Sequence, residues 1–200
     1  SARSQQEPRD LDMVGIGRRA INYLTKIGPR TEGFVPFFGG KLPLHGQPYL
    51  IHCPWDYGDG IGRILEALSF VRRMTGSDEG MDVQEGLVKK LCSLYASDGL
   101  SYREVTPWSS RVSGAVELRS SALALVALIE DGYEHLEPLL ASAVEGISRI
   151  FTPEQMAVAS GVWDGENWTG ERWIGVEIGP GLFVIDALVR CYCVTGNTIA

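Results

Sequence analysis

The sequence predicts an all-α fold, an α/α toroid built of helical hairpins, with about three hairpins and six main helices in this chain. Apolar residues recur with the 3.6-residue period of a helix along six segments. Half-buried segments alternate with segments that are apolar nearly all round, which is typical of an outer and an inner helical layer. At 200 residues the chain can build a hydrophobic core, and we expect a single domain over residues 1–200.

The first predicted hairpin pairs an amphipathic helix with a buried one. Asp10 to Ile27 has its apolar residues on one side and stops at Gly28-Pro29. Gly60 to Thr75 is broadly apolar and is followed by Gly76, a natural C-terminal cap. We therefore expect an outer helix followed by an inner one.

The next two hairpins repeat this order. Val83 to Ala96 is amphipathic, and Ala115 to Asp131 contains the longest apolar run of the chain, so it must be buried nearly all round. Glu134 to Phe151 has the most regular helical stripe. Gly181 to Thr195 is again apolar nearly all round.

A short internal repeat supports the hairpin array. Residues 64–68 and 75–76, in the first inner segment, align with residues 184–188 and 195–196 in the last one. The last segment is interrupted by Asp186 and Arg190, whose i,i+4 spacing would let them form an ion pair.

Three long loops lead into the inner segments, whereas the loops that leave them are short. In a hairpin array this places every long loop at one end, together with the N-termini of the inner helices, whose free N–H groups favour anions and polar ligand oxygens. Long ordered loops are usually functional. The long loops are Gly28 to Asp59, Ser97 to Gly114 and Thr152 to Pro180.

All five tryptophans lie in these loops, beside most of the candidate carboxylates. Flat aromatic side chains next to paired acids form a surface that suits a ring-shaped, hydroxyl-rich ligand. The tryptophans are Trp55, Trp108, Trp163, Trp168 and Trp173.

Charge and composition exclude several classes of protein. The net charge of −7 argues against a nucleic-acid binder and against docking on anionic lipid. No apolar run approaches the roughly 18–20 residues that span a bilayer. The four cysteines show no framework spacing, and Cys191 and Cys193 would point apart on a helix, which favours a reduced state. We expect a soluble protein, cytoplasmic or periplasmic.

Four short motifs resemble those of the six-hairpin glycosidase superfamily, the (α/α)6 toroids. They are WDYGD at 55–59, GRxxEAL at 62–68, TG at 75–76 and DGLSY at 98–102. Proteins with similar motifs include bacterial enzymes related to arabinofuranosidases and to unsaturated-uronyl hydrolases. The resemblance implies a glycoside hydrolase, retaining or inverting, or a polysaccharide lyase, with its cleft over the N-termini of the inner helices.

A complete toroid of this kind has six hairpins, and we expect three here. The resemblance therefore implies the N-terminal half of a larger toroid, or a half that closes as a homodimer. The implied ligand is an oligosaccharide or polysaccharide fragment, and the chemistry requires no cofactor and no metal.

The leading hypothesis is hydrolysis of a glycosidic bond by two carboxylates across a tryptophan-lined cleft. The predicted catalytic pair is Asp56 with either Glu117 or Glu177. The residues predicted to bind substrate are Trp55, Asp59, Arg63, Tyr102, Arg103, Trp108, Trp163, Asp164, Trp168 and Trp173.

Each of these assignments has a structural alternative. Asp59 is equally placed to be the N-cap of the following helix, and Glu117 to be a partner of the helix dipole. The segment that contains Tyr102 and Arg103 reads first as a turn around Asp98. The loop from Trp163 onward could be a rigid plug over the core instead of a ligand-binding loop.

Other functions remain open at this point. The chain could be a non-catalytic helical scaffold that binds sugar or protein, with its acids capping helices. In a lyase, Tyr102 or His52 would be the base. A zinc toroid similar to the lanthionine cyclases would use His52 and Cys53 with Cys191 or Cys193. A terpene-handling toroid would need an aspartate-rich cluster, and the sequence has none.

Overall fold

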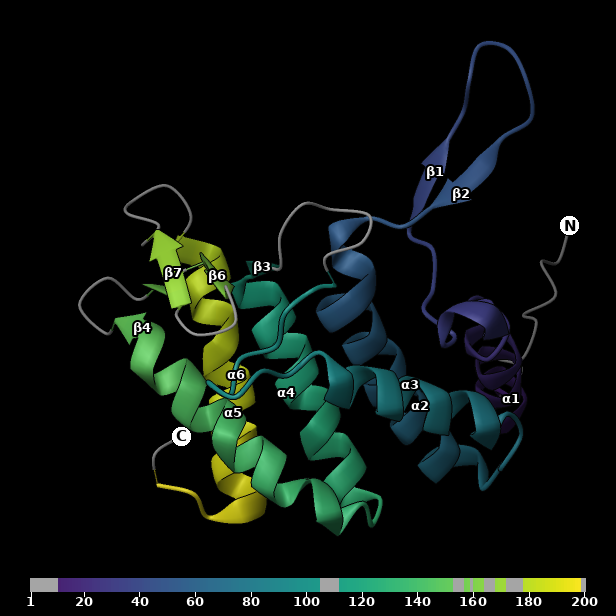
Figure 1. The fold of residues 1–200 in the computed structure, drawn as a ribbon. Helices are drawn as coiled ribbons and strands as arrows, with labels where there is room; N and C mark the ends of the chain where they lie inside the picture. Colours follow the sequence, from purple (N-terminus) through teal and green to yellow (C-terminus); the bar gives the residue numbers. More distant parts are fainter. Residues whose placement is uncertain are drawn as a thin grey trace, which may run out of the picture.

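The structure of the chain is a computed structural model that describes residues 11–104, 112–152, 157–158, 160–163, 168–171 and 178–198. Within these ranges the protein is mostly helical, as predicted (Figure 1). The α-helices are α1 (Met13–Leu24), α2 (Gly62–Thr75), α3 (Met81–Ser93), α4 (Ala115–Glu130), α5 (Glu137–Ile150) and α6 (Ile178–Thr195). None of them is long and apolar enough to cross a membrane, among the residues that the structure describes.

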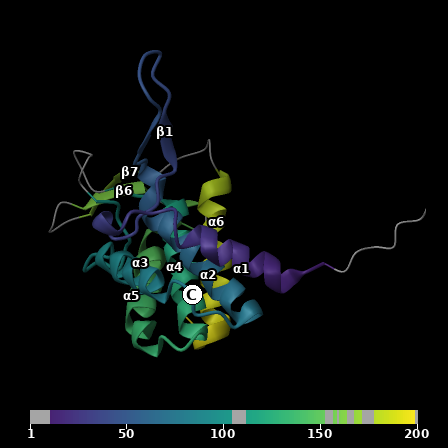
Figure 2. The ribbon, with the colours of Figure 1, turned by 90° about the vertical axis from the view of Figure 1, so that its right-hand side faces the viewer.

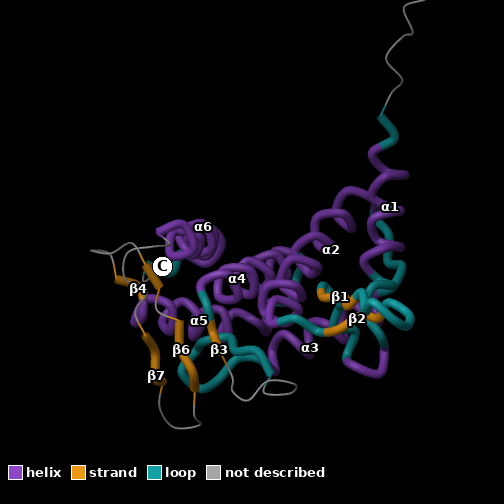
Figure 3. The backbone as a smooth tube through the Cα atoms, turned by 90° about the horizontal axis from the view of Figure 1, so that it is seen from above, coloured by secondary structure: helices purple, strands orange, loops and turns teal. Residues whose placement is uncertain are grey.

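Helices α2, α4 and α6 lie side by side in one row and run in the same direction (Figures 1 and 3). Helices α3 and α5 cover one face of this row, and α1 lies beside α2 at its edge (Figure 3). The predicted alternation between two layers holds from α2 to α6, whereas α1, expected in the outer layer, lies at the edge of the row. The N-termini of α2, α4 and α6 all lie at the same end (Figure 1).

The central helix of the row, α4, is buried nearly all round, as its apolar run predicts. One core cluster packs α4 against α2 and α3, with Leu65, Leu91 and Leu125 among its members. A second cluster joins α4 to α5 and α6, with Leu123 and Val184 among its members. Both clusters share α4, so this helix fixes the positions of its neighbours.

The helix boundaries differ from the predicted ones by a few residues. Helix α6 begins at Ile178 and includes Pro180 in its first turn, where a missing N–H costs no intrahelical bond. Helix α2 is preceded directly by a π-helix, η3 (Tyr57–Ile61), and by a 3-10 turn, η2 (Pro54–Asp56). Two further 3-10 turns are η1 (Arg30–Glu32) and η4 (Glu134–Leu136).

The long loops contain short antiparallel strands that the all-helical prediction missed. Strand β1 (Gly39–Lys41) pairs with β2 (Tyr49–Ile51), and β4 (Phe151–Thr152) pairs with β5 (Ala157–Val158). Strand β6 (Ser160–Trp163) lies between β3 (Val112–Ser113) and β7 (Trp168–Glu171). The β3–β6 pairing joins the loop before α4 to the loop before α6.

Ion pairs join the three helices of the row. Arg190 of α6 lies 2.8 Å from Glu66 of α2, and Arg119 of α4 lies 2.6 Å from Asp186 of α6. The i,i+4 pair expected between Asp186 and Arg190 is therefore wrong, because Asp186 pairs with Arg119 of α4 and Arg190 pairs with Glu66 of α2. The two repeated carboxylates, Glu66 and Asp186, thus both accept hydrogen bonds from arginines of other helices.

Candidate functional site

Two acidic residues lie in neighbouring segments where the N-terminal end of α2 approaches the first turn of α4. Asp59 lies in the π-helix η3 that leads into α2, and Glu117 lies in the first turn of α4. Gly58 makes this approach possible, because a Cβ at that position would lie only 2.9 Å from the Cβ of Glu117. The sequence segments 55–59 and 115–120 are thereby brought together at the end where the three parallel helices begin (Figure 1).

Asp59 is tied to both helices by its side chain. Its Oδ1 accepts hydrogen bonds from Nε of Arg63, at 2.6 Å, and from Oγ of Ser120, at 2.5 Å. The alternative prediction, that Asp59 is the N-cap of α2, is wrong. The π-helix η3 continues directly into α2, and the N-cap residue is Ile61, which makes no side-chain capping bond. Asp59 instead links α2 to α4.

Glu117 is buried, and its surroundings favour the protonated form. Burial raises the pKa of Glu117 above its usual range, and the nearby charge of Asp59 raises it further, while the carboxylate's bond to its own backbone N–H and the charge of Arg103 act in the opposite direction. A carboxyl with a raised pKa beside a second carboxylate is a frequent arrangement in acid–base active sites. Glu117 lies in the first turn of α4, so its charged form would also interact favourably with the helix dipole, as the structural alternative predicts.

Asp56 is fully buried, and both of its oxygens are occupied. Oδ1 accepts from the backbone N of Phe38, at 3.1 Å, and from Sγ of Cys53, at 2.9 Å. Oδ2 accepts from the backbone N of Cys53, at 2.9 Å, and lies 2.7 Å from Nδ1 of His52. A substrate would find no accessible oxygen, so the structure does not support the predicted catalytic role of Asp56.

His52 is held between two carboxylates. Its Nε2 lies 2.6 Å from Oε2 of Glu32, and its ring stacks on Phe37 with the ring centroids 4.2 Å apart. Both ring nitrogens of His52 are thus engaged by carboxylate groups of the protein. His52 is therefore not placed to be the base of a lyase.

Tyr102 lies in the core and not at the rim of a cleft. It is fully buried, and its hydroxyl donates to Oδ2 of Asp98 at 2.6 Å. Asp98 also accepts from the backbone N of Leu100, and Gly99 has a positive φ, so the predicted turn is confirmed. Burial excludes Tyr102 both as a rim residue and as a lyase base, whereas the neighbouring Arg103 is partly exposed.

The remaining predicted residues divide into three groups. Trp55 is 53% exposed in η2, and Arg63 is more than half exposed beside Asp59, so both remain available to a ligand. Trp163 and Trp168 lie opposite each other in the β6–β7 register. The residues outside the described ranges are Trp108, Asp164, Trp173 and Glu177.

Sequence reasoning missed a second charged group around Tyr57. Lys90 of α3 forms an ion pair with Glu104, and its Nζ lies 5.9 Å from the centroid of the Tyr57 ring. Burial, followed by the charges of Glu104, Asp56 and Glu32, raises the pKa of Tyr57 to about 12. No local pattern indicated this group, because its members come from four separate segments.

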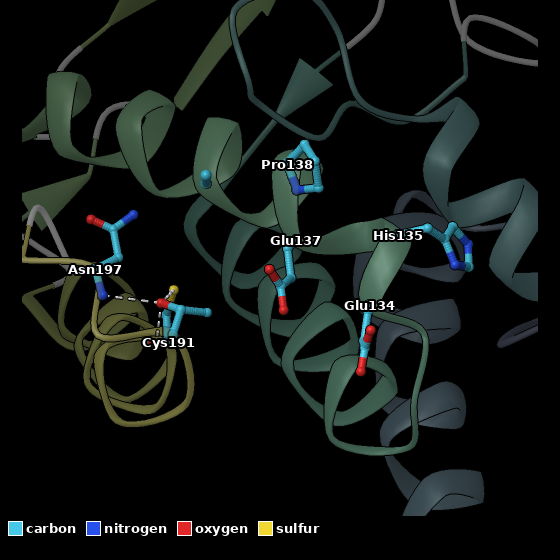
Figure 4. A pocket seen from close by; sticks show the side chains of 8 residues that line it. Glu134, His135, Glu137, Pro138, Cys191 and Asn197 are labelled. Carbon is cyan, nitrogen blue, oxygen red and sulfur yellow. Dashed lines mark hydrogen bonds between the residues drawn. The ribbon is translucent and has the colours of Figure 1, made fainter.

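An open pocket of about 500 Å³ lies at the opposite end of the helix row, between the start of α5 and the end of α6. Glu134, His135 and Glu137 lie on one side of it, and Cys191 and Asn197 on the other (Figure 4). Both of its glutamates are exposed, so they lack the burial that distinguishes Glu117. We therefore place the candidate site at Asp59 and Glu117.

The proposed zinc ligands are not brought together. His52 and Cys53 precede α2 at one end of the row, whereas Cys191 and Cys193 lie in the last turns of α6 at the other (Figures 1 and 4). Within the described residues, no group of three or more His, Cys, Asp or Glu side chains could hold a metal ion.

Comparison with protein-family models, with curated proteins and with solved structures found no match to this chain.

Proposed function

We propose that this chain belongs to a carbohydrate-active enzyme of glycoside hydrolase type and that Asp59 and Glu117 are its two carboxylates. The main support is the placement of these two residues at the N-terminal ends of adjacent parallel helices, where Glu117 is buried and the charge of Asp59 helps to raise its pKa. Glycosidases work with two carboxyl groups that differ in protonation. Asp59 replaces Asp56 in the predicted pair, because Asp56 is saturated with donors.

In this proposal Glu117 is the general acid. Its raised pKa keeps the proton on the carboxyl group at a higher pH than usual, ready for transfer to the oxygen of the leaving sugar. Asp59 is the second carboxylate, which stabilises the positive charge that develops on the sugar ring or activates the attacking water. Arg63 and Ser120 fix the orientation of Asp59 through Oδ1.

Exposed groups around this pair suit a sugar. Trp55 presents a flat, half-exposed ring one turn before Asp59, and such rings stack well on the apolar faces of pyranose units. Arg63 and Arg103 supply donors for hydroxyl or carboxylate groups of a uronic acid or neutral sugar. The parallel row of α2, α4 and α6 supports the further proposal that these are inner helices of an α/α toroid.

The experiment is a hydrolysis screen with aryl glycosides and unsaturated uronides, followed by variants with the active substrate. We expect Glu117→Gln and Asp59→Asn each to lower kcat/KM at least about a hundredfold. Glu134→Gln is the matched control, since Glu134 is an exposed glutamate at the far end of the row. Full activity in both site variants, with a folded chain, would refute the assignment.

A second candidate function is a non-catalytic scaffold that binds sugar or protein. It is favoured by Asp56, whose carboxylate accepts two backbone N–H bonds and so serves structure alone. The two functions differ in the same screen: a scaffold would be stabilised against heat by a sugar without cleaving any of the glycosides.

A further inference from the structure

The hairpin of β1 and β2 projects from the helical body as an arm, defined here as residues 38–51 (Figures 1 and 2). Its two strands are only three residues long, and among the described residues they pair with each other alone. An isolated two-stranded hairpin is marginally stable in water. An arm of this kind therefore gains stability when another surface covers it.

The arm exposes large apolar side chains along its whole length. Leu42 and Leu44 at the tip are 85% and 98% exposed, and Phe38, Tyr49 and Leu50 are each more than half exposed. Single exposed apolar residues are common on protein surfaces, but contiguous groups usually mark an interaction site.

The base of the arm is fixed, so the arm is held away from the body. Asp56 accepts a hydrogen bond from the backbone N of Phe38. The Phe38 ring lies against Gly60 of η3, where a Cβ would meet it at 2.5 Å. A presented, pre-organised segment loses less conformational entropy on binding than a free one.

The charge distribution makes the arm the place where two copies of this acidic chain can meet. From Gly33 to Trp55 the chain has no Asp or Glu, and Lys41 is its only Lys or Arg, whereas the whole chain has a net charge of −7. Two copies of such a chain would repel each other over most of their surface. The arm is a part of the surface where two copies can meet without facing carboxylates.

The exposed area also favours a second copy. At roughly 150–200 Å² for each large apolar side chain, the arm exposes on the order of 600 Å². A stable interface buries about 800 Å² on each partner, so one arm docked on an unrelated protein falls short. In a two-fold dimer each copy buries its own arm and also the surface that receives the partner's arm. The area buried on each copy is then about twice that of one arm, which exceeds the area that a stable interface needs.

We propose that the arm docks on a second copy of this chain and forms a two-fold dimer by reciprocal arm contacts. This inference is independent of the proposed glycosidase function, because it rests on the hairpin and its charge alone.

The experiment measures the mass of the chain in solution by light scattering over a wide concentration range. We expect twice the monomer mass of 21.9 kDa at high concentration, and the monomer mass for the variant Leu42→Ser/Leu44→Ser. Neither side chain packs in the core, so this variant should keep the wild-type circular dichroism and melting temperature. A second variant, Leu44→Arg, changes only the most exposed of these side chains and should also be monomeric.

The matched control is Val189→Ser/Tyr192→Ser, which removes two apolar side chains of α6 that are also more than half exposed. This variant should stay dimeric. A wild-type chain that is monomeric throughout, or arm variants that remain dimeric, would overturn the proposal. A monomer that binds phosphatidylcholine vesicles through the arm would also overturn it, in favour of a lipid surface.

Discussion

Gly62 of α2 lies directly against the backbone of Ser120 in α4. A Cβ at position 62 would lie 2.4 Å from the carbonyl oxygen of Ser120 and 2.5 Å from its carbonyl carbon. These are backbone atoms, which cannot move aside as a side chain can. The contact sets the spacing between α2 and α4 and places the Ser120 hydroxyl within reach of Asp59.

We predict that Gly62→Ala destabilises the protein by about 2–3 kcal/mol, because the added methyl group forces the two helices apart. The sign is informative, since alanine at an unhindered helical position would stabilise by about 1 kcal/mol. Urea unfolding measures the change. Gly40→Ala is the control: nothing lies within 4 Å of its Cβ position, and its effect should stay within about 0.5 kcal/mol. A neutral or stabilising Gly62→Ala would show that the helices are not in this contact.

Asp56 is predicted to be essential for stability. Asp56→Ala would leave His52, the Cys53 N–H and the Phe38 N–H without their acceptor, and we expect a loss of about 3–5 kcal/mol in urea unfolding. The control is Asp82→Asn, which breaks the exposed pair with Arg30 and should change stability little. Equal effects of the two substitutions would contradict the structural role of Asp56.

The raised pKa of Glu117 predicts a pH dependence of stability. Because the folded-state pKa lies above the ordinary value of 4.5, the protonated group contributes stability that is fully present below that value. This contribution is lost as the pH rises through the folded-state pKa. The side chain in Glu117→Gln cannot ionise, so the variant does not lose this contribution. Its free energy of unfolding should therefore rise relative to that of the wild type as the pH is increased from acidic to alkaline.

The measurement for Glu117 is urea unfolding of both chains at several pH values. Glu134→Gln is the control, since Glu134 is exposed and its substitution should leave the pH profile of the wild type unchanged. Parallel profiles for wild type and Glu117→Gln would mean that the carboxyl group is solvated in solution.

The pair of Arg190 and Glu66 should contribute modestly to the attachment of α6. A double-mutant cycle with Arg190→Met and Glu66→Gln is expected to give a coupling of about 0.5–1 kcal/mol, since both side chains are partly exposed. The coupling should fall with added salt. A double-mutant cycle on Arg30 and Asp82 provides the reference for an exposed pair. If the coupling energy of Arg190 and Glu66 is no larger than this reference, the pair does not help to attach α6.

The helices were predictable because each one repeats an apolar pattern over three or more turns. Helix α4 illustrates this, since its eight-residue apolar run predicts the burial that it has. The strands were missed because β3 has two residues, too few to show alternation, and its partner β6 lies far along the chain. Likewise, the pattern of Asp186 and Arg190 suggested a local pair, but both charges are taken by other helices.

The sequence places its candidate acids at the end of the molecule where we propose the site, but it does not separate Asp59 from Asp56. Asp56 and Asp59 are equally plausible in sequence, three residues apart. They are distinguished by Phe38, which donates to Asp56 from 18 residues away, and by Ser120, which reaches Asp59 from 61 residues away. Such long-range contacts determine which carboxylate is saturated, and no local spacing encodes them.

The π-helix η3 has a consequence for how chains of this kind can vary in length. A π turn holds one residue more than an α turn over the same rise, so losing one residue between Tyr57 and Ile61 would close the turn as regular α-helix. The segments on both sides of the deletion would then keep their places, because the π turn already takes up the extra residue. The change would fall inside η3, where Tyr57, Gly58 and Ile61 are buried and Asp59 bonds to Ser120 of α4. A chain one residue shorter here would therefore keep its hairpin and its helix row, but it would lose the present contact between η3 and α4.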